Sequence, residues 1–254
     1  MRIVIKIGTS TLTHENGSTN LRRIEALCRI VSDIINSGEE IILVSSGAIG
    51  MGVGKLGLRS RPSDIAGKQA CAAVGQCELM YEYDKLFGEY NHTVAQILLT
   101  APDLSCDDRR EKFENTVERL IELGVLPIIN ENDTVATEEI VFGDNDTLAA
   151  KVAVTVGADL LILLSDIDGL YTADPRKDKN ATLIAEVKEI DKKIEALAGS
   201  AGSNRGTGGM ETKIRAAKIA TERGCDMIIA NGSSPELLYE IIEGKSVGTK
   251  FFAK

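Results

Sequence analysis

Glycine-rich and small polar segments follow several short apolar runs in this chain of 254 residues. Two of these segments carry a lysine: residues 6–10 (KIGTS) near the N-terminus, and residues 206–213 (GTGGMETK), where a glycine turn leads into a helical pattern. Glycine allows backbone N–H groups to approach phosphate oxygens closely, and a helix N-terminus adds partial positive charge. A plain turn explains any single glycine pair. Together with Lys6 and Lys213, however, these segments predict a site for a triphosphate.

Asparagine and aspartate gather in two other segments, residues 130–133 (NEND) and 143–146 (GDND). Amide and carboxylate groups can hold the ammonium group of an amino acid, orient neighbouring lysines or lie close to Mg²⁺. Asx turns and a helix N-cap at Asp144 or Asn145 explain the same residue types without a ligand. The two interpretations are compatible, so both segments are candidates for ligand contact.

Two familiar nucleotide-binding motifs receive little support. No segment matches the P-loop pattern G-x-x-x-x-G-K-[ST]. A G-x-G-x-x-G pattern occurs at residues 52–57, but it begins several residues after the preceding apolar run, and Arg61-Pro62 separates it from the next helical stretch. No clear ribose-binding acid follows about 20 residues later. A nicotinamide-dependent oxidoreductase is therefore the weaker alternative.

The elements that must position these segments alternate along the chain. Short apolar, β-branched runs predict strands at residues 2–7, 40–44, 93–98, 125–129, 160–164 and 227–230. Helical spacing of apolar residues predicts helices at residues 21–37, 64–87, 110–123, 144–156, 210–223 and 235–243. Continuous apolar runs indicate strands buried on both faces of a mainly parallel sheet. The chain is therefore predicted to be a doubly wound α/β protein, in which ligands bind at the carboxyl ends of the strands.

Composition and organisation exclude several classes of protein. The net charge of −9 and the aromatic content of 4%, with no Trp, argue against nucleic-acid binding and against binding to an anionic membrane. No apolar stretch is long enough to span a bilayer. Five cysteines without C-x-x-C spacing predict free thiols, a cytoplasmic location and no structural metal site. No linker or repeat divides the chain, and residues 199–209 are interpreted as a mobile active-site loop.

The pattern of segments resembles that of the amino acid kinase family. The matching segments are residues 4–10 (VIKIGTS), 44–50 (VSSGAIG), 68–76 (KQACAAVGQ), 127–136 (PIINENDTVA), 143–146 (GDND), 168–176 (DGLYTADPR) and 206–213 (GTGGMETK). The resemblance implies a three-layer αβα sandwich around a central, mainly parallel sheet of about eight strands. It further implies one amino acid kinase domain over residues 1–254, in the short form that lacks the C-terminal PUA domain of many members.

The resemblance also implies a role for each matching residue. The expected catalytic residues are Lys6 and Lys213, with Asp146 as the acid that positions both lysines. The expected glutamate contacts are Ser46, Asp133 and Asn145. The expected ATP contacts are Lys6, Ser165, Asp166, Thr207, Gly208, Gly209, Met210, Glu211, Thr212 and Lys213. Ser165 stands where many members have threonine, and it keeps the hydroxyl group. No residue is expected to be a dedicated metal ligand.

The implied activity is ATP-dependent phosphorylation of the γ-carboxylate of L-glutamate, the first step of proline biosynthesis, with Mg²⁺ as cofactor. Other members of the family act on N-acetylglutamate, aspartate, carbamate or UMP, and residues 129–136 and 143–146 favour free glutamate over these. A non-catalytic amino-acid sensor is the alternative from another class, which the presence of both lysines disfavours. The resemblance also implies a homo-oligomer, either a dimer or a tetramer, and hand-over of the labile product to glutamyl phosphate reductase.

Overall fold

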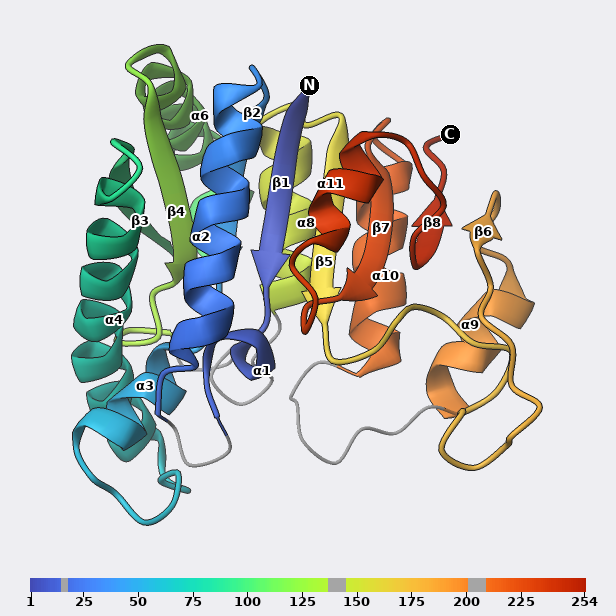
Figure 1. Cartoon of the computed structure of the whole chain (residues 1–254), viewed down its shortest axis with the longest axis horizontal. Helices are drawn as coiled ribbons and strands as arrows, with labels where there is room; N and C mark the ends of the chain where they lie inside the picture. Colours follow the sequence, from blue (N-terminus) through green and yellow to red (C-terminus); the bar gives the residue numbers. More distant parts are fainter. Residues whose placement is uncertain (15–17, 137–144, 201–208) are drawn as a thin grey trace.

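The computed structural model describes residues 1–14, 18–136, 145–200 and 209–254 (Figure 1). Within these residues, eight strands form one sheet in the order β3-β4-β2-β1-β5-β7-β8-β6. Neighbouring strands are parallel except β7 and β8, which are antiparallel. The strands are β1 (Arg2–Ile7), β2 (Glu40–Ser45), β3 (Thr93–Leu99), β4 (Val125–Glu131), β5 (Leu160–Ser165), β6 (Glu186–Val187), β7 (Asp226–Asn231) and β8 (Thr249–Phe251). The predicted mainly parallel α/β architecture is therefore confirmed.

Helices cover both faces of the sheet (Figure 1). One face carries α2 (Leu21–Asn36), α4 (Ile65–Gly88) and α11 (Leu237–Ile242). The other carries α6 (Asp107–Glu122), α8 (Asn145–Thr155) and α10 (Met210–Thr221). Shorter helices are α1 (Thr9–Leu12), α3 (Ala48–Lys55), α5 (Ala101–Ser105) and α9 (Lys192–Ser200). Because alternate residues of a strand point to opposite faces, two apolar cores result, and β1 contributes Val4 to one and Ile3 and Ile5 to the other.

The register of the central strands decides which segments meet. In β1, Lys6 lies beside Val44 of β2 and Leu163 of β5. These three strands are parallel, and β4 is parallel to β2, so all four have their carboxyl ends at one edge of the sheet. The loops that follow these strands therefore lie together, as the sequence predicts for a ligand site.

Several elements differ from the sequence prediction. The pattern misses β6 and β8 because strands of two and three residues are too short to show a period. It also misses α1, α5, α9 and α3, and α3 has glycine at positions 50, 52 and 54, a residue with low helix propensity. The last helix, α11, begins at Leu237 and not at Pro235, and Glu236 at its N-cap forms no capping bond through its side chain.

Glycines allow α3 and α4 to cross at very short distance. A Cβ atom added to Gly75 of α4 would lie 1.8 Å from the carbonyl oxygen of Ala48. A Cβ atom added to Gly52 of α3 would lie 1.8 Å from the carbonyl oxygen of Cys71. Gly47, which precedes α3, has a φ of 101°, a conformation that favours glycine. The packing of α3 on α4 therefore compensates for the weak helix propensity of α3 and fixes the start of α3 next to β2.

We expect Gly75→Ala to lower the free energy of unfolding by about 1–3 kcal/mol, because a methyl group overpacks this crossing and must push α3 away. Urea unfolding monitored by circular dichroism measures the change. Gly88→Ala is the matched control at the last residue of the same helix, where an added Cβ meets nothing within 4 Å. The control should leave stability unchanged or raise it slightly. Equal stability of the two variants would contradict the tight crossing.

The described part of the chain has no helix that combines the length and the hydropathy a membrane span requires. Its five cysteines are all free thiols. Cys77 and Cys106 are exposed, while the other three are buried. No disulfide therefore contributes to the stability of this fold.

Candidate active site

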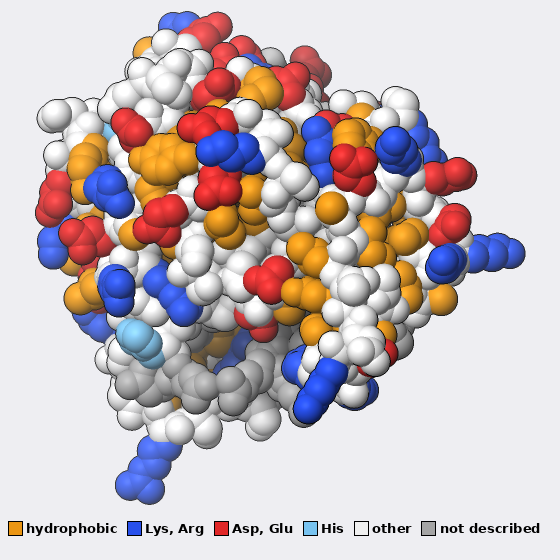
Figure 2. All heavy atoms as spheres, turned by 45° about the vertical axis from the view of Figure 1, so that its right-hand side comes forward, with side chains coloured by type: hydrophobic (Ala, Val, Ile, Leu, Met, Phe, Trp, Pro, Cys, Tyr) orange, Lys and Arg blue, Asp and Glu red, His pale blue; other side chains and the backbone are white. Residues whose placement is uncertain are grey.

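The candidate site lies where the central strands end. Lys6 is near the end of β1, Ser46 follows β2, Asp133 follows β4 and Asp166 follows β5. The helices α8 and α10 begin at the same edge of the sheet (Figure 1). The space-filling view shows a hollow toward this end of the molecule, in which basic and hydrophobic side chains are visible (Figure 2). The topology thus gathers segments from six parts of the sequence.

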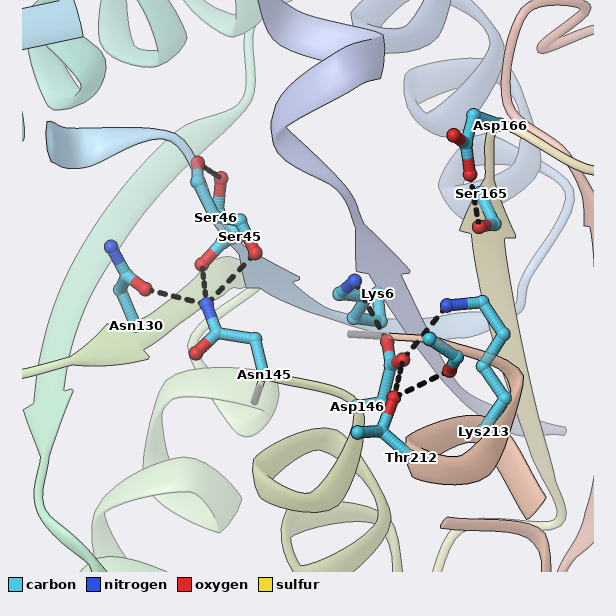
Figure 3. A network of polar contacts seen from close by, with 11 residues as sticks. Lys6, Ser45, Ser46, Asn130, Asn145, Asp146, Ser165, Asp166, Thr212 and Lys213 are labelled. Atoms are coloured by element: carbon cyan, nitrogen blue, oxygen red, sulfur yellow. Dashed lines mark hydrogen bonds and ion pairs between the residues drawn. The ribbon is translucent and has the colours of Figure 1, made fainter. Parts of the chain in front are cut away.

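Asp146, in the first turn of α8, joins the two lysines. Its Oδ1 lies 2.7 Å from Lys6 Nζ, and its Oδ2 lies 2.9 Å from Lys213 Nζ (Figure 3). Thr212 Oγ1 also donates to Oδ2, at 3.0 Å. Asp146 is 1% exposed, and the side chains of Lys6 and Lys213 are 11% and 5% exposed. Residues from β1, α8 and α10 therefore form one buried ionic cluster.

The charges in this cluster favour an anionic ligand. Burial alone would raise the pKa of Asp146, but the ammonium groups of Lys6 and Lys213 outweigh burial and hold the pKa well below its usual range. Asp146 is therefore a carboxylate at neutral pH. One carboxylate between two ammonium groups leaves the three side chains with a net positive charge. In a buried setting, that charge attracts a phosphate or carboxylate more strongly than it would in water.

A second cluster of polar residues surrounds Asn145, the first residue of α8. Its Nδ2 lies within hydrogen-bonding distance of three acceptors, which share its two hydrogens. They are the carbonyl oxygen of Ser45 and Ser46 Oγ, both at 2.9 Å, and Asn130 Oδ1 at 3.0 Å (Figure 3). Asn130 Nδ2 in turn donates to Gln76 Oε1 at 2.8 Å. The structure thus brings together two of the three predicted glutamate contacts. The resemblance assigned no role to Asn130 or Gln76. Asn130 belongs to the segment of residues 130–133 that its residue types made a candidate for ligand contact, whereas only its position in a matching segment pointed to Gln76.

Asp133, the third predicted glutamate contact, lies two residues beyond β4 and is half-buried. Within the described residues, no hydrogen bond joins it to Ser46 or Asn145. Burial raises the pKa of Asp133 to about 6, although the positive charge of Arg61 opposes this effect. Asp133 therefore changes its charge slightly below neutral pH.

A cavity of about 270 Å³ lies on the Lys213 side of the cluster. Its lining includes four of the predicted ATP contacts, which are Asp166, Gly209, Met210 and Lys213. The apolar part of the lining includes Ile167, Leu170, Leu197 and Met210. An apolar cavity beside a buried cation suits a ligand with a flat base and attached phosphates.

The other predicted ATP contacts lie in different settings. Ser165 ends β5, and its Oγ donates to Asp166 Oδ1 at 3.2 Å. Glu211 is exposed and forms a long ion pair with Arg215, 3.7 Å between Oε1 and Nη2, so its side chain does not line the cavity. Two of the predicted contacts lie outside the described residues, namely Thr207 and Gly208.

Sequence reasoning gave no role to three polar side chains that line the same cavity. Asp168 Oδ1 accepts a hydrogen bond from Asn231 Nδ2 at 2.7 Å, and Asp168 Oδ2 accepts one from the hydroxyl group of Tyr171 at 2.8 Å. Asp168 and Tyr171 belong to the segment of residues 168–176, which comes soon after β5. Its place after a central strand was the signal that could have identified them.

The fold and the site define an open α/β protein with a positively charged cluster between an apolar cavity and an amide-rich area. The chain belongs to the amino acid kinase family, whose model matches residues 1–231.

Relatives with high sequence identity share one name. A protein of Clostridium perfringens named glutamate 5-kinase is 57% identical, with 100% of this chain and 96% of the relative covered. A protein of Clostridium acetobutylicum with the same name is 54% identical, with coverage of 100% and 95%. A third, from Carboxydothermus hydrogenoformans, is 55% identical, and the match covers 100% of this chain but 68% of the relative.

Solved structures of more distant proteins share the fold. Carbamate kinase from Giardia lamblia bound to AMP-PNP superposes with a TM-score of 0.70 at 16% identity, covering 100% of this chain and 98% of that one. Isopentenyl phosphate kinase from T. acidophilum, in a product complex, gives a TM-score of 0.65 at 17% identity, with coverage of 99% and 100%. At these identities, the likeness establishes the fold alone.

Proposed function

We propose that the protein transfers the γ-phosphoryl group of ATP to the γ-carboxylate of L-glutamate, forming ADP and L-glutamyl 5-phosphate, as the first step of proline biosynthesis. The observation that carries the proposal is the buried cluster of Lys6, Asp146 and Lys213. Asn145 lies on the Lys6 side of this cluster (Figure 3). The cavity lies on the other side, because its lining includes Lys213 and not Lys6. Relatives at 57% and 54% identity named glutamate 5-kinase support glutamate as the acceptor.

The chemistry needs positive charge more than it needs a base. The γ-carboxylate of glutamate is already an anionic nucleophile, so no group has to remove a proton. The barrier is repulsion between this carboxylate and the γ-phosphoryl oxygens, which positioning and cations reduce. In an in-line transfer, a carboxylate oxygen forms a bond to the γ-phosphorus as the bond to the β,γ-bridging oxygen breaks. The bridging oxygen then leaves with ADP.

The residues around the cluster divide between the two substrates. We assign the base of ATP to the apolar cavity, and its phosphates to Ser165, Asp166 and residues 207–213. Lys213 then faces the leaving oxygen, and Lys6 faces the transferring group from the acceptor side. Asp146 holds both ammonium groups in place. The glutamate contacts are Ser46, Asp133 and Asn145.

Mg²⁺ fits this site as an ion that is bound mainly by the phosphates of ATP. The described residues include no group of three or more His, Cys, Asp or Glu side chains arranged to hold a metal, and two lysines occupy the carboxylate of Asp146. Mg²⁺ does not need such a group, because it usually binds substrate phosphates, waters and one or two carboxylates. The exposed carboxylate of Asp166 at the cavity is available to it. When bound, the ion supplies further positive charge to the phosphates.

The proposal is tested by trapping the product. Acyl phosphates react with hydroxylamine, so the chain with ATP, Mg²⁺, L-glutamate and hydroxylamine should form γ-glutamyl hydroxamate. A coupled assay of ADP release should show slower turnover with N-acetylglutamate, aspartate, carbamate or UMP. Release of ADP with one of these acceptors and no hydroxamate from glutamate would contradict the proposal.

Glutamate binding should weaken as the pH falls through about 6, the pKa of Asp133. Above this pH, Asp133 is a carboxylate that attracts the α-ammonium group, whereas its protonated form does not. The carboxyl groups of free glutamate stay ionised in this range. We expect the KM for glutamate to rise at low pH with little change in the KM for ATP. Initial rates measured at about pH 5 to 8 provide the test.

Two variants complete this prediction. Asp133→Asn should raise the KM for glutamate at neutral pH and remove its dependence on pH. Asn145→Ala should raise the KM but keep the pH dependence, because Asp133 is still present. Wild-type KM values in both variants would exclude these residues from the glutamate site.

Three further points belong to the same proposal. We infer a cytoplasmic location, a homo-oligomer of two or four chains, and direct use of the product by glutamyl phosphate reductase. An acyl phosphate hydrolyses in water, so less of the product is lost when an enzyme that consumes it lies nearby. Light scattering after size-exclusion chromatography measures the oligomer, and a mass of 27.3 kDa would show a monomer instead.

A further inference from the structure

The backbone fixes the direction of the hydrogen bonds around Asn145. The N–H group of Glu131 donates to Asn130 Oδ1 at 2.9 Å, so this oxygen is an acceptor. Asn145 also faces the carbonyl oxygen of Ser45, at 2.9 Å, which is likewise an acceptor. The group of Asn145 between these two oxygens must therefore be its NH₂ group. The amide cannot be turned over without placing oxygen against oxygen.

This orientation leaves the carbonyl oxygen of the Asn145 side chain for a ligand. Nδ2 faces three acceptors, of which Ser46 Oγ is the third. Among the described residues none donates to Asn145 Oδ1, and Figure 3 shows this oxygen directed away from the three acceptors. An amide oxygen binds a donor such as an ammonium group and repels a carboxylate.

The side-chain amide of Gln76, in α4, continues the series of hydrogen bonds that joins Asn145 to Asn130. Asn130 Nδ2 donates to Gln76 Oε1 at 2.8 Å, and the two residues are 2% and 9% exposed. At Gly75, the residue before Gln76, α3 and α4 cross so closely that an added Cβ atom would lie 1.8 Å from the carbonyl oxygen of Ala48. The position of Gln76 is therefore set by the packing of two helices and not by a flexible loop.

We propose that Gln76 is a positioning residue for the acceptor substrate: through Asn130, it holds the amide of Asn145 so that Oδ1 accepts a hydrogen bond from the α-ammonium group of glutamate. This inference rests on the proposed function of the same site. Ser46 complements it, because Ser46 Oγ accepts from Asn145 and its own O–H group donates to none of the described residues. Asn145 Oδ1 can thus accept from the ammonium group of an α-amino acid, while the O–H group of Ser46 can donate to its carboxylate.

The hydrogen bonds from Gln76 through Asn130 to Asn145 also explain how the site would select its phosphoryl acceptor. An N-acylated acceptor replaces the ammonium group by a neutral amide with a single N–H, and glutarate lacks the nitrogen altogether. Neither ligand can form the charge-assisted bond to Asn145 Oδ1. Loss of Gln76 should therefore reduce the preference for a free α-ammonium group and leave binding of the remaining carboxylates unchanged.

The test is Gln76→Met, which keeps the length of the side chain and removes the acceptor. The KM for glutamate should rise about tenfold, as for loss of one hydrogen bond to a charged group. Values of kcat and of the KM for ATP should stay within about twofold, because the lysine cluster is untouched. Gln76→Glu keeps an oxygen that can accept from Asn130, so it should restore most of the affinity.

Glutarate distinguishes positioning from general damage. Its inhibition constant against glutamate should be the same in wild type and Gln76→Met. Gln96→Met, on the exposed edge strand β3, is the matched control and should behave as wild type. Equal weakening of glutamate and glutarate, or an unchanged KM for glutamate, would overturn the proposal. Absence of hydroxamate from the wild-type chain would instead contradict the proposed function.

Discussion

Replacing Lys213 or Lys6 by methionine is expected to lower kcat by about 100- to 1,000-fold, the usual effect of removing one preorganised donor from a developing negative charge. Their ammonium groups lie 2.9 and 2.7 Å from one buried carboxylate, so the protein sets their positions before substrates bind. Such charges stabilise the transferring phosphoryl group more than the resting complex. The KM values for ATP and glutamate should therefore change much less than kcat.

Steady-state kinetics with the hydroxamate assay measures the effect. Methionine keeps most of the volume of the lysine stem, and Asp146 keeps one lysine partner in either variant. Folding should survive, which thermal unfolding can verify. Lys112→Met, at an exposed position of α6, is the control and should retain wild-type kcat. If either site variant kept wild-type kcat, that lysine would have no part in the transfer.

Much of the sheet can be predicted because its strands are buried on both faces. A continuous run of Val, Ile and Leu marks such a strand, and the predicted bounds of β1 agree with the structure at both ends. β8 has only three residues, too few to show a pattern. The helix α3 depends on glycine contacts with the next helix, α4, and these contacts give no signal within the sequence of α3 itself.

The candidate site, too, can be predicted from the sequence only in part. Parallel strands end at the same edge, so the position of a motif after a strand predicts which loops meet. The resemblance, and not the spacing of residues, suggested that Asp146 lies next to Lys6 and Lys213. Gln76 had no chemical signature of its own within α4, because its importance comes from burial and from its bond to Asn130. Burial and hydrogen bonds between residues far apart in sequence can be seen only in the folded structure.

Replacing Asp146 by asparagine should lower the free energy of unfolding by about 3–5 kcal/mol near pH 7, the usual cost of removing one partner from a buried ion pair. The variant leaves the ammonium groups of Lys6 and Lys213 buried without the carboxylate that now lies between them. Asparagine has nearly the same shape as aspartate, so altered packing contributes little. Urea unfolding without substrates measures the loss, and kcat should fall as well because the lysines lose their common anchor.

The pH dependence identifies the loss as electrostatic. Although burial opposes it, the two ammonium groups lower the pKa of folded Asp146 below the unfolded value of about 3.9. An acid with a lowered folded pKa stabilises the protein above its unfolded pKa and loses this contribution as the pH falls through the folded pKa. The difference between wild type and Asp146→Asn should therefore be complete at pH 7 and shrink below about pH 4. Asp108→Asn, which breaks the exposed pair with Lys112, should cost less than about 1 kcal/mol. An Asp146→Asn variant as stable as wild type at pH 7 would mean that the carboxylate does not hold the two lysines together.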